Sequence, residues 1–112
     1  MTNRFMQKLA IYKRQRDKLG LNISDELLEA ITKSLGSAIY KRETEIISVQ
    51  KGEIAKIKKE FLGNKLGLGD NPILDEHIWK VLEKLGLSNK RKYRVLVYCL
   101  LVIKFGKQSY FI

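Results

Sequence analysis

The chain has 112 residues, 45% of them hydrophobic and 9% aromatic, and its 22 basic and 12 acidic side chains give a net charge of +10. The length allows one domain with a modest core, and the apolar content excludes a disordered chain. The most apolar run, residues 95–103, is shorter than the roughly 20 residues that a membrane-spanning helix needs. We therefore predict a single domain over residues 1–112 with no membrane span.

The single cysteine, Cys99, excludes an internal disulfide. The opening sequence Met-Thr-Asn-Arg-Phe lacks the apolar stretch of a signal peptide. Together these features lead us to expect a reduced, cytoplasmic protein.

The sequence Lys-Leu-Gly-Leu occurs at residues 18–21, 65–68 and 84–87. The unequal spacing excludes a repeat architecture, but the motif is typical of a helix end. The lysine faces the negative end of the helix dipole, the glycine adopts the left-handed conformation, and the second leucine folds back onto the helix. These motifs divide the chain into helices.

The first predicted helix spans residues 3–19. It has a narrow apolar stripe, formed by Phe5, Leu9 and Tyr12 and continued by Arg16. Because a narrow apolar face buries little surface, we expect residues 1–20 to be the most loosely packed part of the domain.

The second predicted helix starts at the N-cap residue Ser24. Its apolar face continues past Gly36 to Ile39, which predicts a helix to about Arg42 with Gly36 allowing a close neighbour. The alternative is that Gly36 ends the helix and a short second helix follows. Residues 43–50 are predicted to connect onward and to pack their apolar side chains on the core.

Two further helices are predicted before the C-terminal region. The third spans residues 52–66 and is followed by a loop containing Gly67, Gly69 and Asp70. The fourth is capped by Asn71, with Pro72 in its first position. The side chains predicted to face the core from these two helices are Ile54, Ile57, Phe61, Leu62, Ile73, Leu74, Ile78, Val81, Leu82 and Leu85.

The fifth predicted helix spans residues 88–105, with Ser88 as its N-cap and Gly106 as its stop. It is apolar on nearly all sides, which is typical of a helix with neighbours on several faces. We therefore predict an all-α fold: a single compact bundle of about five helices with this helix at its centre and residues 109–112 folded back on it.

Several short motifs between residues 27 and 111 suggest a family. They are Phe-Leu-Gly-Asn-Lys-Leu-Gly-Leu at 61–68, Leu74-Asp75 with Ile78, Lys-Tyr-Arg-Val at 92–95, Tyr-Cys-Leu-Leu at 98–101 and Phe-Gly-Lys at 105–107. In this combination the chain resembles a small bacterial family known as domain of unknown function 2853. The resemblance implies a compact all-helical domain and brings no activity, ligand or catalytic residue.

The basic side chains are concentrated at the two ends of the chain. Residues 1–20 carry six basic and one acidic side chain, and residues 88–112 carry six basic and none acidic. A cationic cluster in the first turn of the last helix would oppose the helix dipole, and such a conflict is typical of an anion site. The candidate anion or nucleic-acid-binding residues are Lys90, Arg91, Lys92 and Arg94, with Arg14 and Arg16 of the first helix.

Two structural explanations compete with this hypothesis. The lysine excess can reflect composition alone, as on any solvated face. The cluster can also pair with acidic residues of a neighbouring helix, for which Asp75, Glu76 and Glu83 are candidates.

No motif predicts catalysis. His77 has no metal-ligand partner at helical spacing, and Cys99 lies within an apolar run, where a thiol is poorly reactive. We therefore expect no enzyme activity, no metal and no cofactor. The first functional hypothesis is a protein-interaction or self-associating module, and the alternative is a nucleic-acid-binding protein.

Overall fold

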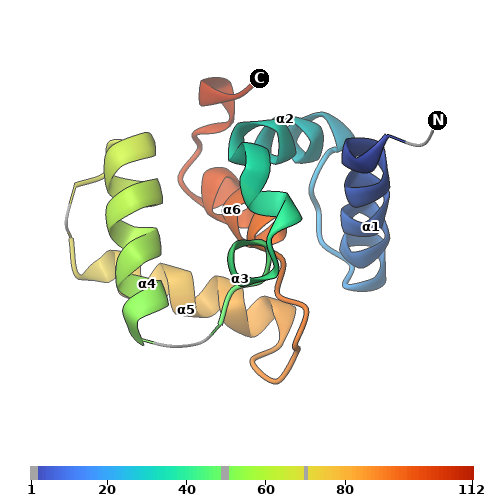
Figure 1. Ribbon diagram of the computed structural model, residues 1–112. Coiled ribbons are helices and arrows are strands. Elements are labelled where there is room, and N and C mark those ends of the chain that lie inside the picture. Colours follow the sequence, from blue (N-terminus) through green and yellow to red (C-terminus); the bar gives the residue numbers. More distant parts are fainter. Residues whose placement is uncertain (1–2, 49–50, 70) are drawn as a thin grey trace.

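A computed structural model describes residues 3–48, 51–69 and 71–112, and Figure 1 shows helices packed around a central one. The central helix is α6 (Arg94–Lys104), whose residues 94–102 are all buried. It packs against α1, α2, α3 and α5. The predicted all-α fold and the central position of this helix are confirmed.

The predicted start of the central helix at Ser88 is wrong, because α6 begins at Arg94. Residues before it are held in turns by Asn89, whose side chain donates to the carbonyl of Leu85 at 3.0 Å. The backbone of Lys92 and Tyr93 is extended, since it pairs with Ile46 and Ile47 of a distant segment. Tertiary pairing therefore replaces the first turns of the predicted helix.

Helix α1 (Arg4–Lys18) is capped by Asn3, whose Oδ1 accepts from the N–H of Phe5 at 2.8 Å. Leu9 and Tyr12 of its apolar stripe lie in the core. The helix ends as its Lys-Leu-Gly-Leu motif predicts, with Gly20 at φ +66°. The first helix is thus attached to the core by two buried side chains.

Helix α2 (Asp25–Leu35) is capped by Ser24, as predicted. It ends at Gly36, so the prediction of a continuous helix to Arg42 is wrong and the alternative is correct. A 3₁₀ segment, η1 (Gly36–Tyr40), and the short helix α3 (Arg42–Glu45) follow. A Cβ at position 36 would meet nothing within 4 Å, so no close neighbour requires a glycine there. The glycine is explained by its backbone conformation, with φ at +58°.

The third predicted helix is continuous but changes type along its length. It begins as the α-helix α4 (Lys51–Lys56) and continues as the π-helix η2 (Ile57–Lys65). Its predicted core residues Ile54, Ile57, Phe61 and Leu62 are buried. Two glycines of the following loop, Gly67 and Gly69, have positive φ values. Val49, Gln50 and Asp70 of the predicted connections lie outside the described residues.

Helix α5 (Ile73–Leu85) begins one residue after the predicted start, and the Oδ1 of Asn71 accepts from the N–H of Ile73 at 3.1 Å. Ile73 is half exposed, whereas the other five residues of the predicted face are buried.

After α6, η3 (Gln108–Tyr110) folds the tail back, and the ring of Phe111 stacks on Phe61. Among the described residues, we find no helix with the length and hydropathy to cross a membrane.

Candidate anion-binding groove

A groove of about 730 Å³ lies where α1, the η1–α3 segment and the loop before α6 meet. One carboxylate, that of Glu45, and two aromatic side chains, Tyr40 and Tyr93, contribute to its lining. Its cationic lining residues are Lys8, Arg14, Arg42, Lys90 and Arg91. We call this surface the basic groove.

Three separate parts of the chain supply these cations. Lys8 and Arg14 belong to α1, and Arg42 is the first residue of α3. Lys90 and Arg91 lie in the loop before α6, where Asn89 Oδ1 accepts from the N–H of Arg91 at 2.9 Å. This turn keeps the side chains of Lys90 and Arg91 exposed. The fold therefore joins the two basic ends that the sequence shows separately.

Glu45 is the largely buried carboxylate of the basic groove. It accepts hydrogen bonds from the hydroxyl of Tyr12 at 2.6 Å and from Nζ of Lys8 at 2.9 Å. Burial and this hydrogen bond raise the pKa of Tyr12, so its hydroxyl stays protonated and keeps donating. The charge of Lys8 is therefore compensated by Glu45.

The other four cations of the basic groove have no such compensation. Arg14, Arg42, Lys90 and Arg91 are exposed, and none of them forms an ion pair with another described residue. Their positive charges therefore remain available to an anion in solution.

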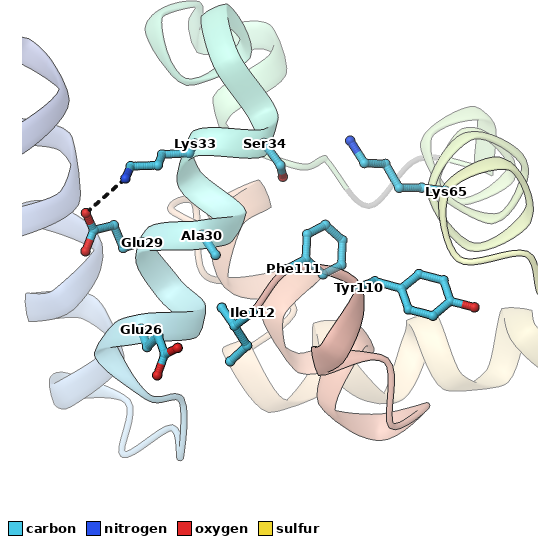
Figure 2. A pocket seen from close by; sticks show the side chains of 9 residues that line it. All are labelled: Glu26, Glu29, Ala30, Lys33, Ser34, Lys65, Tyr110, Phe111 and Ile112. Carbon is cyan, nitrogen blue, oxygen red and sulfur yellow. Dashed lines mark ion pairs between the residues drawn. The ribbon is translucent and has the colours of Figure 1, made fainter.

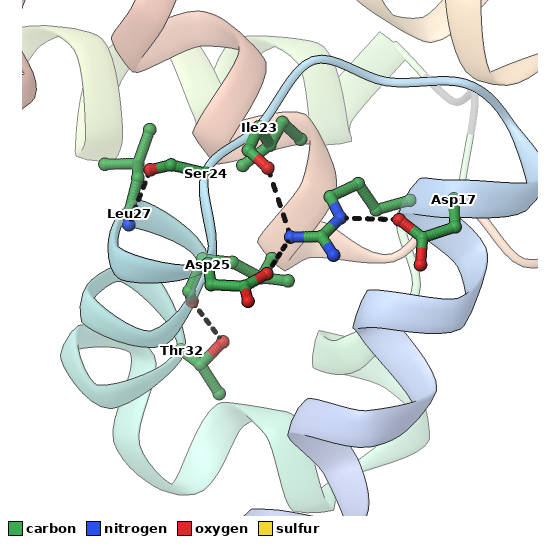
Figure 3. A network of polar contacts seen from close by, with 8 residues as sticks. Asp17, Ile23, Ser24, Asp25, Leu27 and Thr32 are labelled. Atoms are coloured by element: carbon green, nitrogen blue, oxygen red, sulfur yellow. Dashed lines mark hydrogen bonds and ion pairs between the residues drawn. The ribbon is translucent and has the colours of Figure 1, made fainter.

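Arg16 lies elsewhere. Its Nε pairs with Asp17 at 3.0 Å, and its terminal nitrogen pairs with Asp25 and donates to the carbonyl of Ile23 at 3.1 Å (Figure 3). The hydrogen bond from Arg16 lowers the pKa of Asp25. This arginine joins the end of α1 to the start of α2 and does not line the basic groove.

Arg94 is also committed within the protein, because only 4% of its surface is exposed. Its guanidinium pairs with Glu53, donates to the hydroxyl of Tyr98 at 2.9 Å, and donates to the carbonyl of Thr44. The alternative hypothesis was that these cations pair with acidic residues of a neighbouring helix, and Arg94 does pair with an acidic residue of another helix. The partner is Glu53, which the helical spacing of the sequence gave no reason to choose.

Lys92 is the remaining predicted site residue, and it is as buried as Arg94. It lines a second groove, of about 570 Å³, between the α3 segment and the loop before α6. Arg42, Ile46 and Lys90 line both this second groove and the basic groove, so the two adjoin.

A third groove, of about 660 Å³, lies between α2 and the C-terminal segment (Figure 2). Phe111 and Ile112 line it opposite Ala30. Of the charged side chains along it, Glu29 and Lys33 pair with each other at 3.4 Å. This groove combines apolar side chains with both signs of charge.

The two residues with catalytic potential in the sequence lie apart from these grooves. Cys99 is wholly buried, and burial raises the pKa of its thiol, which leaves it protonated and unreactive. The ring of His77 meets Phe105 edge-on with centroids 5.3 Å apart. Within the part of the chain that the structure describes, no three His, Cys, Asp or Glu side chains gather as metal ligands.

A model of one family of proteins of unknown function, DUF2853, matches residues 11–109. The match confirms the resemblance and extends it into α1, which the short motifs had left out. A search of curated proteins finds no match. Four cations of the basic groove lie within the matched region, and Lys8 lies before it. Since the model covers far more than half of the sequence, the chain belongs to the DUF2853 family of proteins of unknown function.

Proposed function

We propose that this protein acts by binding a nucleic acid strand in the basic groove, without catalysis. The observation that supports this proposal is the convergence of Arg14, Arg42, Lys90 and Arg91, all exposed and without ion-pair partners among the described residues, on one concave surface. A cationic groove of this kind favours a polymer that carries a phosphate at every nucleotide. The reduced state implied by the single cysteine fits a cytoplasmic setting, which we also propose.

The groove favours a single strand over a duplex. The bases of a single strand can stack on aromatic rings, and the exposed Tyr40 lines the groove beside the cations. The guanidinium of Arg4 lies over this ring, 4.7 Å from its centroid, and adds a positive charge beside it. A duplex presents a convex surface with its bases paired, so it would contact only the rim.

The test is fluorescence anisotropy of labelled single-stranded RNA and double-stranded DNA across a salt series. The groove variant is Arg14→Gln, Lys90→Gln and Arg91→Gln together, which keeps the buried Lys92 and Arg94 intact. The control variant is Lys18→Gln, Lys56→Gln and Lys59→Gln, which removes the same charge at exposed positions that line none of the three grooves.

Binding of the single strand should weaken with salt. In the groove variant, the slope of log affinity against log salt concentration should fall by about 2, since each lost phosphate contact on a single strand contributes about 0.7. The control variant should keep most of the slope. Equal effects of the two variants would mean diffuse charge, and no salt-sensitive binding would end the proposal.

Protein–protein contact, including self-association, is a second candidate function. It is favoured by the exposed apolar side chains of Tyr110 and Ile112 at the third groove (Figure 2). Light scattering over a wide concentration range tests it, with Tyr110→Ser and Ile112→Ser as the variant. A concentration-dependent mass that the variant abolishes would support self-association, and a monomer throughout would count against it.

A further inference from the structure

The ammonium group of Lys92 is a buried cation that the binding of a strand in the basic groove does not explain. Only 4% of the residue's surface is exposed, and Nζ donates to the carbonyls of Leu87, at 3.0 Å, and Asn89. Arg94, two residues later, is equally buried but meets the carboxylate of Glu53. For Lys92 there is no carboxylate partner among the described residues.

A buried ammonium without a counter-charge is unfavourable, and here burial lowers the pKa of Lys92. An ammonium has three N–H donors, and the two carbonyls account for two of them. An anion that accepted the third hydrogen bond would compensate the charge. Lys92 lines the second groove, so an anion there would lie beside it.

The composition of the second groove indicates which anion fits. Three cations, Arg42, Lys90 and Lys92, and one carboxylate, Glu43, line it, which leaves two positive charges uncompensated. Hydroxyl donors are present as well, from Ser48 and Ser88. This set matches a doubly charged group with several acceptor oxygens better than a carboxylate with one charge and two oxygens.

We propose that the second groove binds a phosphate monoester, with Lys92 beside the phosphate and Arg42 and Lys90 between this groove and the basic groove. A monoester carries a charge of about −1.5 to −2 at pH 7 and three terminal oxygens, whereas a phosphodiester within a strand carries one charge. Because the two grooves share Arg42 and Lys90, the monoester would be the terminal phosphate of the strand in the basic groove. This step rests on the proposed function.

The first experiment follows lysine side chains by NMR in the full chain labelled with ¹³C-lysine, with Lys92 assigned from the Lys92→Arg variant. Inorganic phosphate is titrated at pH 7.5 against sodium chloride of matched ionic strength. The ε-CH₂ signal of Lys92 should shift saturably with phosphate, and the pKa of Lys92 should rise. Lys33, exposed on α2, serves as the control. A Lys92 signal that responds equally to phosphate and chloride, or no more than Lys33, would overturn the proposal.

The second experiment compares single strands with a 5′-phosphate, a 3′-phosphate or no terminal phosphate. One phosphorylated strand should bind about tenfold more tightly, as expected for charge-assisted hydrogen bonds. Lys92→Met should remove this advantage and leave the affinity for the unphosphorylated strand within about twofold. If Lys92→Met does not fold, Ser48→Ala with Ser88→Ala replaces it, because both serines are exposed and line the groove.

The outcomes separate the two proposals. If phosphate shifts Lys92 but no strand binds, the monoester site stands, its ligand is a small phosphorylated molecule, and the nucleic-acid function fails. If strands bind in the basic groove but neither terminal phosphate nor inorganic phosphate affects Lys92, the function stands and the monoester site is refuted.

Discussion

The hydroxyl of Tyr12 donates a 2.6 Å hydrogen bond to the carboxylate of Glu45, which lies 33 residues further along the chain. This bond fixes α1 against α3, and both helices contribute residues to the lining of the basic groove. A side chain that sequence analysis assigns to a narrow apolar stripe thus also positions the cations of the candidate site.

Replacing Tyr12 with phenylalanine should therefore destabilise the protein. A buried hydrogen bond to a charged acceptor contributes about 1.5 to 3 kcal/mol, so Tyr12→Phe should lower the free energy of unfolding by this amount. Urea denaturation measures the change. The control is Tyr110→Phe, which removes an exposed hydroxyl and should change the stability by less than about 0.5 kcal/mol. Equal effects of the two variants would mean that the Tyr12 hydroxyl has no structural role.

The pairing of Arg94 with Glu53 joins α6 to α4 and should be sensitive to the loss of one partner. Glu53→Ala would leave a guanidinium buried without a counter-charge, which should cost about 3 kcal/mol or more in unfolding free energy. Glu60→Ala, on the neighbouring π-helix and exposed, should change it by less than about 0.5 kcal/mol. A small loss in Glu53→Ala would show that solvent compensates the charge of Arg94.

Alkaline pH should destabilise the fold through three buried acids. Burial raises the pKa of Cys99, Tyr12 and Tyr98, so these groups stay protonated in the folded chain. They ionise in the unfolded chain near pH 8.5 for cysteine and about 10 for tyrosine. The unfolded state then binds fewer protons, so stability falls as pH rises. Lys92 has a lowered pKa, so its titration alone would raise the stability as pH rises. It is one group against the three buried acids, so we expect the stability to fall.

Urea midpoints measured between about pH 7 and 11 test this expectation. Stability should begin to fall near pH 8.5, and the Cys99→Ala variant should delay the fall to about pH 10. The variant will be less stable throughout because it leaves a small cavity, so the comparison concerns the onset of the fall and not its level. An onset that Cys99→Ala does not move would contradict the assignment.

Two glycines make a matched pair for backbone strain. Gly36 has φ +58°, Gly52 has no positive φ, and an added Cβ meets nothing within 4 Å at either position. Gly36→Ala should therefore cost about 1 to 3 kcal/mol from its conformation alone. Gly52→Ala, in α4, should stabilise the protein by about 0.5 to 1 kcal/mol. Thermal denaturation of both variants measures the two changes in stability. If both substitutions stabilised or both destabilised the protein, the positive φ would not explain the glycine at position 36.

The sequence predicted the start and end of a helix well where these depend on residues close in the sequence. Asn3 and Ser24 act as N-caps, and Gly20, Gly67 and Gly86 take positive φ values at helix ends. The errors arise where contacts with distant segments of the chain determine the backbone conformation. The chain before α6 is extended because it pairs with a distant segment, and the carbonyl of Lys92 accepts a hydrogen bond from the N–H of Ile47 at 2.8 Å. Helical periodicity carries no information on such a contact.

Sequence analysis named some of the residues that line the basic groove. Of the six candidate residues, the structure brings Arg14, Lys90 and Arg91 together there, an arrangement that the sequence alone did not indicate. Charge alone could not show that Arg94 is buried against Glu53, because the two are 41 residues apart. Arg42 was missed, since nothing in its local sequence distinguishes it from other exposed arginines.

The cations of the basic groove come from three segments that lie far apart in the sequence, so only folding brings them close to one another. The folded state therefore carries electrostatic repulsion that the unfolded chain largely avoids. A polyanion that binds the folded state more tightly than the unfolded chain stabilises the folded state, and this stabilisation grows with the logarithm of the polyanion concentration above its Kd. The melting temperature should then rise with polyanion concentration even when the natural ligand is unknown, so thermal stability itself becomes an assay for the ligand.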